Sequence, residues 1–157
     1  MSSIYEIMTP DPITLSPDAS LAEAGSIMFE KRIRHIPIVD KDKQLLGLIT
    51  QRDILAAGAS TESAKPIADV MRTSIYTIAE EDDLRSAALK MQKFKIGSLP
   101  VLKDERLVGI ITDTDYVSLA INLLEQMAEV EPDEFQDYDD DENLSGYMEK
   151  VNDKVES

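Results

Sequence analysis

The phrase GLITQRDIL, residues 47–55, returns further along the chain as GIITDTDYV, residues 109–117. Both copies contain a glycine, two aliphatic residues, a threonine, two variable residues, an aspartate and another aliphatic residue. An apolar run that ends at a threonine and gives way to a charged segment is typical of a strand that leads directly into a helix. The repetition therefore marks either a junction that a duplicated fold needs twice or two copies of a binding site.

The two phrases belong to a much longer internal repeat. An offset of 63 residues aligns Met8 with Met71, and after one residue is removed from a polar turn, Asp53 aligns with Asp115. The other matched pairs are Thr14 and Thr77, Leu21 and Leu84, Ala24 and Ala87, Met28 and Met91, Ile33 and Ile96, Pro37 and Pro100, Gly47 and Gly109, and Thr50 and Thr112. Matches in the same order over about fifty residues indicate a duplicated unit.

Each unit predicts the same order of elements: strand, helix, strand, strand, helix. Short β-branched runs around a charged turn are the hairpin signal, and Ser20 with Glu23 has the spacing of a helix capping box. In the first unit, strands are expected at residues 12–17, 35–40 and 45–50, and helices from residue 20 onward and at 51–57. In the second unit, strands are expected at residues 74–80, 98–102 and 107–112, and helices from residue 84 onward and after residue 112.

These elements predict an α+β fold of two repeats. The expected boundaries are 4–58 and 66–124 for the repeats, 59–65 for a linker of small and polar residues, and 125–157 for an acidic tail that is partly helical or disordered. A unit of about 55 residues buries too little surface to be stable alone. We therefore expect the two units to pack sheet to sheet around a shared core.

The composition is that of a globular protein, with 43% hydrophobic residues and no cysteine. The absence of cysteine excludes disulfides, thiolate metal sites and a thiol nucleophile. The sequence has no basic start followed by an apolar run, and no uninterrupted apolar stretch near the roughly 18 residues that a membrane helix needs. We expect a soluble, cytoplasmic protein that has no membrane partner.

The net charge of −15 is concentrated at the end of the chain, where residues 125–157 carry 13 acidic and 2 basic side chains. Such a chain repels a phosphate backbone, so nucleic acid is not an expected partner. Asp137, Asp139 and Asp141 have the first spacings of a calcium loop, but Glu142 replaces the required glycine and Met148 the final glutamate, so we predict no metal site. A helix that docks on a partner is an alternative for the tail, because four apolar residues have helical spacing: Leu144, Tyr147, Met148 and Val151.

The threonine and aspartate of the repeated phrase allow two interpretations. In the first, Thr50 and Asp53 form a capping box, in which each side chain bonds to the other's backbone N–H group. In the second, the helix N-terminus and the threonine hydroxyl bind a phosphate, while the carboxylate accepts hydrogen bonds from the vicinal hydroxyls of a ribose. The two interpretations are compatible for the threonine and compete for the carboxylate. The same holds for Thr112 and Asp115.

Basic residues distinguish the first copy from the second. Arg34 and His35 precede or begin the first hairpin, and Arg52 lies inside the repeated phrase. The matching residues of the second copy are Gly97, Ser98 and Thr114. His35 is either a partly buried polar residue or a phosphate contact, and in the second case binding would weaken as the pH rises. Two related sites with unequal charge are therefore expected.

Over residues 4–124, the duplicated pattern resembles a tandem pair of CBS domains, named for cystathionine β-synthase. The matching segments are IMTPDPITLSPDASLAEAGSIMFEKRIRHIPIVD with GLITQRDIL, and VMRTSIYTIAEEDDLRSAALKMQKFKIGSLPVL with GIITDTDYV. The resemblance implies a pseudo-twofold module, the Bateman module, which often forms homodimers and binds adenine nucleotides or related adenosyl ligands. It makes AMP, ADP, ATP and S-adenosylmethionine the candidate regulatory ligands, and it requires no cofactor.

The resemblance also implies two crossed sites between the repeats. In each site, one repeat faces the adenine while the other holds the ribose and the phosphate. The residues implied for one site are Thr77, Ile96 and Gly97 at the adenine, Asp53 at the ribose, and Thr50 and Arg52 at the phosphate. Arg34 and His35 are further phosphate candidates because of their charge, without assignment to either site. Those implied for the other site are Thr14, Ile33 and Arg34 at the adenine, Asp115 at the ribose and Thr112 at the phosphate.

Three functions are compatible with these features. In the leading hypothesis, an adenosyl ligand that contacts both repeats shifts their packing, and an unidentified effector protein responds. In the second, the module binds no ligand, dimerises, and contacts its partner through the acidic tail. An enzyme is the third, but the sequence has no P-loop lysine motif, no zinc-binding histidine pair and no G-x-S-x-G motif. We therefore predict no catalytic residues.

Overall fold

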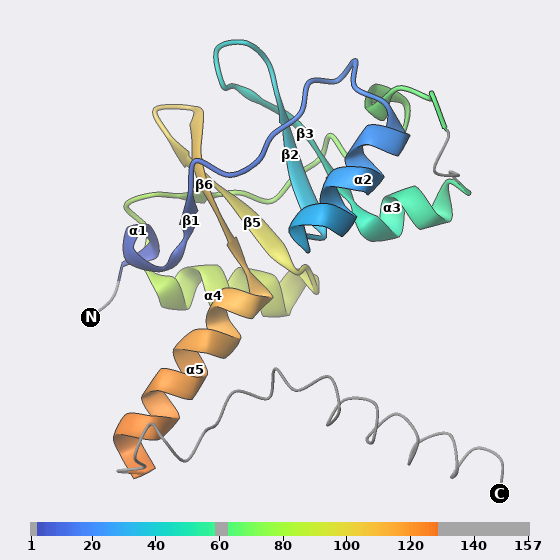
Figure 1. Ribbon diagram of the computed structural model, residues 1–157. Coiled ribbons are helices and arrows are strands. Elements are labelled where there is room, and N and C mark those ends of the chain that lie inside the picture. Colours follow the sequence, from blue (N-terminus) through green and yellow to red (C-terminus); the bar gives the residue numbers. More distant parts are fainter. Residues whose placement is uncertain (1–2, 59–62, 129–157) are drawn as a thin grey trace, which may run out of the picture. The chain divides into compact units, whose positions relative to one another are not determined.

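A computed structural model describes residues 3–58 and 63–128 (Figure 1). The chain divides into two compact units, Met1–Tyr116 and Val117–Ser157, and the first contains both repeats up to the start of the last helix. Residues 59–62 of the expected linker lie outside the described residues. So does most of the acidic tail, including its calcium-loop spacing and its expected helix.

The structure confirms the two hairpins and the helices on either side of them. The first repeat contains α1 (Ile4–Ile7), β1 (Thr9–Pro10), α2 (Leu21–Lys31), β2 (His35–Val39), β3 (Leu45–Thr50) and α3 (Gln51–Ala56). The second contains a 3-10 helix, η1 (Ile67–Asp69), followed by β4 (Ile78–Ala79), α4 (Leu84–Phe94), β5 (Ser98–Lys103), β6 (Arg106–Thr112) and α5 (Asp113–Ala128). The expected first strand is reduced to a single bridge between Leu15 and Ile38, and β4, its counterpart, has only two residues.

Side-chain caps and apolar stripes explain why α2 and α4 form where they do. Ser20 Oγ accepts a hydrogen bond from the backbone N–H of Glu23 at 3.1 Å, and Asp83 caps α4 in the same way. Each helix ends at a basic residue in the left-handed conformation, Arg32 with φ 55° and Lys95 with φ 54°. The buried residues on the two helices recur at helical spacing: Leu21, Ala24 and Met28 on α2, and Ala87 and Met91 on α4.

The repeats exchange their leading segments. Strand β1 of the first repeat pairs with β6 of the second, as Figure 1 shows. In the same way, Arg72 of the second repeat exchanges two backbone hydrogen bonds, each of 2.9 Å, with Leu48 in β3 of the first. Thr9 in β1 and Arg72 are equivalent residues of the two repeats, because an offset of 63 relates them. Each pairs with the hairpin of the other repeat, so the two pairings are related by the pseudo-twofold symmetry of the module.

The buried side chains form two clusters, so the expectation of one shared core was wrong. One cluster is Leu21, Ala24, Met28, Ile36, Ile38, Ile49 and Ile67. The other is Ile4, Met8, Ile78, Ala87, Met91, Leu99, Val101 and Ile111. Ile4 and Met8 precede the first repeat's hairpin yet lie in the core of the second, and Ile67 does the reverse. Each core is thus completed by the other repeat, which explains why a single unit would be marginal.

This exchange accounts for the glycine of the repeated phrase. A Cβ atom on Gly47 would lie 2.5 Å from Sδ of Met71 and 3.0 Å from the backbone oxygen of Arg72. On Gly109, a Cβ would collide with Met8 in the same manner. Glycine is therefore required where the crossing segment of the other repeat passes over the hairpin.

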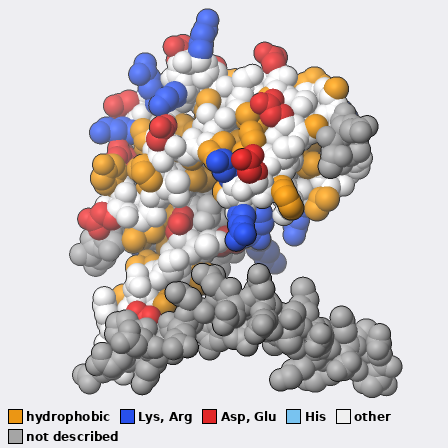
Figure 2. Space-filling view, in the orientation of Figure 1, with side chains coloured by type: hydrophobic (Ala, Val, Ile, Leu, Met, Phe, Trp, Pro, Cys, Tyr) orange, Lys and Arg blue, Asp and Glu red, His pale blue; other side chains and the backbone are white. Residues whose placement is uncertain are grey.

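Within residues 3–58 and 63–128, no helix is both long enough and apolar enough to cross a membrane. Acidic and basic side chains are interspersed over the face shown in Figure 2, without one continuous field of a single sign.

Candidate functional site

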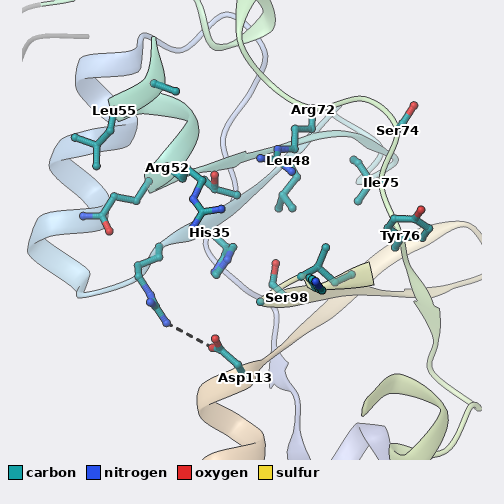
Figure 3. Close-up of a pocket in the computed structure, with 17 residues that line it drawn as sticks. His35, Leu48, Arg52, Leu55, Arg72, Ser74, Ile75, Tyr76, Ser98 and Asp113 are labelled. Atoms are coloured by element: carbon teal, nitrogen blue, oxygen red, sulfur yellow. Dashed lines mark hydrogen bonds and ion pairs between the residues drawn. The ribbon is translucent and has the colours of Figure 1, made fainter. Parts of the chain in front are cut away.

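Both repeats contribute to a cavity of about 790 Å3. Its walls come from the β3–α3 junction of the first repeat and from two segments of the second, residues 72–76 and 95–98 (Figure 3). The charged residues and the histidine that line it are Arg34, His35, Arg52, Arg72, Lys95 and Asp113, and we call it the cationic cleft. In this acidic chain, the cleft concentrates four positive side chains around one carboxylate.

The junction that carries Thr50 and Arg52 is held by a capping box. The backbone N–H of Asp53 donates to Thr50 Oγ1 at 3.2 Å, and the backbone N–H of Thr50 donates to Asp53 Oδ2 at 3.1 Å. In the second repeat, the Thr112 N–H donates to Asp115 Oδ2 at 2.8 Å. The capping interpretation of both aspartates is therefore realised, and Thr50 also lines the cleft.

Asp53 is also ion-paired with Arg72. The Arg72 Nε lies 3.0 Å from Oδ1 and 3.2 Å from Oδ2 of Asp53, and the Arg72 Nη2 lies 3.0 Å from Oδ1. Burial acts to raise the pKa of Asp53, but the hydrogen bonds from Arg72 and Thr50 outweigh it and leave the pKa below its usual value. The carboxylate is therefore ionised at neutral pH, with both oxygens already occupied.

His35 lies where the two hairpins approach each other. A Cβ atom on Gly97 would be 3.3 Å from His35 Nε2 and 3.4 Å from Asp113 Oδ2, so glycine permits this approach. Burial lowers the pKa of His35, and neighbouring Arg34 lowers it further, against weaker opposition from the carboxylates of Asp113 and Asp53. The imidazole is consequently neutral near pH 7.

Replacing His35 with glutamine should change how the stability of the protein depends on pH. Because folding lowers the pKa of His35 below 6.5, the unfolded chain takes up a proton below that pH more readily than the folded protein does. The free energy of unfolding of the wild type should therefore fall more steeply than that of His35→Gln between pH 7.5 and pH 5.5. Urea denaturation at both pH values measures this, and equal slopes would contradict the assignment.

Aromatic and aliphatic side chains form another part of the cavity wall. Tyr76 stacks on Phe94 with a centroid distance of 3.9 Å and an interplanar angle of 12°. Lys90 Nζ donates to the backbone oxygen of Thr77 at 2.8 Å, which holds this segment in place. Figure 3 shows Ile75 and Tyr76 on the side of the cavity away from Arg52. A flat apolar group fits this wall, and an anionic group fits the other.

The structure brings together half of the residues that the sequence singled out. Those that line the cationic cleft are Arg34, His35, Thr50, Arg52, Ile96 and Gly97. Two others are adjacent to it: Asp53 through its bond to Arg72, and Thr77 directly after Tyr76. Thr14 borders a separate groove of about 610 Å3, and Ile33, Thr112 and Asp115 line neither cavity.

Eleven lining residues were not predicted, and four of these are charged or aromatic: Arg72, Tyr76, Lys95 and Asp113. Arg72 had a detectable signal, because it is basic where the other repeat has Thr9. The weak ion pair between Arg34 Nη2 and Asp113 Oδ1, at 3.5 Å, joins residues that are 79 positions apart. No pattern in the sequence indicated this pair. In the described ranges, no cluster of three or more His, Asp or Glu side chains is arranged to hold a metal ion.

Comparison with known proteins defines the class. The CBS domain family model matches residues 4–60 and 67–122. The chain belongs to the CBS domain family, as a tandem pair of repeats.

Three solved structures show the same fold. A protein from Vibrio cholerae described as an acetoin utilization protein, AcuB, is 46% identical, with a TM-score of 0.74 over 84% of this chain and 99% of that one. The CBS domain pair of protein MJ0100, in complex with 5′-methylthioadenosine and S-adenosyl-L-methionine, is 33% identical, with a TM-score of 0.71 over 78% of this chain and 98% of that one. CBSX2, in complex with AMP, is 25% identical, with a TM-score of 0.70 over 79% of this chain and 99% of that one.

Curated relatives are much longer than this chain. A matching enzyme from Methanocaldococcus jannaschii is 36% identical over 113 residues, which are 71% of this chain but 22% of that protein. The likeness is therefore to a CBS pair within a larger protein. Taken together, the comparisons indicate a ligand-binding regulatory module.

Proposed function

We propose that the protein is a regulatory module that binds an adenine nucleotide or a related adenosyl ligand in the cationic cleft and signals to a partner protein. The observation that carries the proposal is that the cleft is lined by both repeats. A ligand there touches Thr50 and Arg52 of one repeat and Tyr76, Ile96 and Gly97 of the other. A ligand shifts a conformational equilibrium only when it binds one state better, and contact with both repeats provides that difference.

The chemistry of the walls supports an adenosyl ligand. The aliphatic and aromatic side chains of Ile75, Tyr76 and Ile96 suit a purine base, and Arg52 and the Thr50 hydroxyl suit a phosphate. Asp53 has the carboxylate that a ribose requires, although Arg72 must move to expose it. The complexes of related CBS pairs with AMP, 5′-methylthioadenosine and S-adenosyl-L-methionine support the same ligand class.

Isothermal titration with AMP, ADP, ATP and S-adenosylmethionine tests this proposal. We expect at least one of them to bind, with a stoichiometry that counts how many sites in each chain are filled. If none binds at millimolar concentration, the proposed function is wrong. Hydrolysis of ATP by the protein would favour an enzyme instead.

A ligand-free dimerisation module is the second candidate, and one observation favours it. Phe29 on α2 is 90% exposed, although aromatic side chains of this size are usually buried or engaged with a partner. Sedimentation velocity over a range of concentrations, with the wild type and with Phe29→Ser, tests for a homodimer. Dimerisation that depends on Phe29, without binding of any adenosyl ligand, would favour this second function. A monomer at every concentration would exclude it.

A further inference from the structure

The cationic cleft differs in charge from the site that the pseudo-twofold relation would place in the other half of the module. Its cations Arg34, Arg52 and Arg72 correspond in the repeat to Gly97, Thr114 and Thr9, none of which is charged. Lys95 alone has a basic counterpart, Arg32. The fold therefore does not require three of the four cations, because the same positions carry small or neutral residues in the other copy.

Arg72 has a second property that sets it apart. Its guanidinium binds both oxygens of Asp53, and the side chain of Asp53 is only 12% exposed. Arg72 lines the cavity, whereas Asp53 does not. A ligand can therefore reach the carboxylate only after the guanidinium has moved away from it.

Moving Arg72 has opposite consequences for different ligands. A nucleoside without phosphate displaces the guanidinium from Asp53 and offers no anion in exchange. A nucleotide offers phosphate oxygens, with which a guanidinium forms short, charge-assisted bonds. S-adenosylmethionine carries a sulfonium, an ammonium and one carboxylate, so it is positively charged overall. It therefore gains less than a nucleotide from a cleft in which four cations face a single lining carboxylate.

We propose that Arg72 sets the ligand class of this cleft, by pairing with Asp53 when the cleft is empty and with a phosphate when it is filled. The cleft then selects nucleoside di- and triphosphates over nucleosides and over S-adenosylmethionine. This inference rests on the proposed function, and it names the class of ligand within it. Arg72 is a specificity-determining residue, and Arg52 and Lys95 provide charge for the second and third phosphates.

Titration calorimetry with adenosine, AMP, ADP, ATP and S-adenosylmethionine tests the proposal. In the wild type, affinity should rise with each phosphate, with ATP about 100-fold or more tighter than adenosine at low salt. S-adenosylmethionine should bind no better than adenosine. Raising the salt concentration should weaken ATP binding and leave adenosine binding nearly unchanged.

Variants that introduce the other repeat's residues sharpen the test. Arg72→Thr should weaken ATP binding about tenfold while tightening adenosine binding, because it removes both a phosphate partner and the competitor for Asp53. Arg52→Thr should weaken ATP binding alone. Lys103→Thr is the matched control, since its ammonium pairs with Glu80 and does not line the cleft. Thermal unfolding of each variant verifies that it is folded.

The outcomes separate the two proposals. Opposite effects of Arg72→Thr on ATP and adenosine would support the role of Arg72, which a merely structural arginine would not produce. Equal affinity of the wild type for adenosine and ATP, or tighter binding of S-adenosylmethionine, would overturn the selection for phosphates and leave the proposed function standing. Failure of every ligand to bind would overturn both. If Arg72→Thr does not fold, the relative affinity of the wild type for adenosine, ATP and S-adenosylmethionine still tests the selection for phosphates, and Arg72→Lys, which keeps the charge but loses the bidentate geometry, tests the role of Arg72.

Discussion

Gly47→Ala is expected to lower the free energy of unfolding by about 1–3 kcal/mol. The new methyl group would lie 2.5 Å from Sδ of Met71 and 3.0 Å from the backbone oxygen of Arg72. The methionine can rotate away, but the backbone oxygen is fixed by the hydrogen bond that it accepts from Leu48. The crossing segment would therefore have to shift, and chemical denaturation measures the cost.

Gly25→Ala is the matched control for this prediction. Gly25 lies inside α2, and a Cβ atom there would meet no atom within 4 Å. Alanine is the better helix former, so this variant should be stabilised by about 0.5–1 kcal/mol. Equal effects of the two substitutions would contradict the crossed arrangement of the leading segments.

Asp53→Asn is expected to weaken binding of ADP about tenfold or more, which corresponds to the loss of one charge-assisted hydrogen bond. The substitution removes the negative charge that the ribose hydroxyls require, while its shape is unchanged. Titration calorimetry gives the affinity, and a parallel denaturation curve separates loss of binding from loss of stability.

Asp115→Asn is the natural control, because Asp115 makes the corresponding backbone bond at Thr112. It bonds to Thr112, which does not line the cleft, whereas Asp53 bonds to Arg72, which does. For Asp115→Asn we expect the affinity for ADP to change by less than about twofold, which is a smaller free energy than one hydrogen bond contributes. An equal loss in both variants would mean that the two repeats carry equivalent sites. No loss in either would remove Asp53 from the site.

Much of the fold could be predicted because short sequence patterns determine its helices and hairpins, and both repeats carry these patterns. The hairpins follow from β-branched runs around charged turns, and α2 and α4 from caps and apolar stripes. The exchange of leading segments could not be predicted in this way. Strand β1 has two residues, and its pairing with Ile110 and Gly109 depends on contacts about a hundred residues away in sequence.

The candidate site was predictable to the extent that the repeat comparison exposed it. Thr50, Arg52, His35 and Gly97 line one cavity. The repeat comparison singled out their charge and spacing, but only the resemblance to CBS pairs implied a site between the two repeats. The pairing of Asp53 with Arg72 was missed because the aspartate was interpreted only through its own helix. A carboxylate that caps a helix with one oxygen still has acceptor capacity, and a cation from the other repeat uses it here.

The comparison between the repeats also explains why the segment at residues 47–55 is repeated at residues 109–117. Its glycine is required by the crossing methionine, and its threonine and aspartate cap the following helix. The glycine and the aspartate have these roles in both copies. The threonines differ, because Thr50 accepts the N–H of Asp53 whereas the Thr112 hydroxyl donates to Asp115 Oδ2. The cations that surround only one copy are not explained by the fold, and they are the basis of the proposed ligand selectivity.

Mapping of ADP binding by NMR tests the central claim most directly. In a titration of the 15N-labelled protein, the backbone amides of Thr50, Arg52, Tyr76 and Gly97 should shift together with a single saturation curve. The amides of Thr14 and Lys41, which border the other groove, should remain unchanged. Shifts confined to that groove, or no shifts at saturating ADP, would contradict the account of a ligand held between the two repeats.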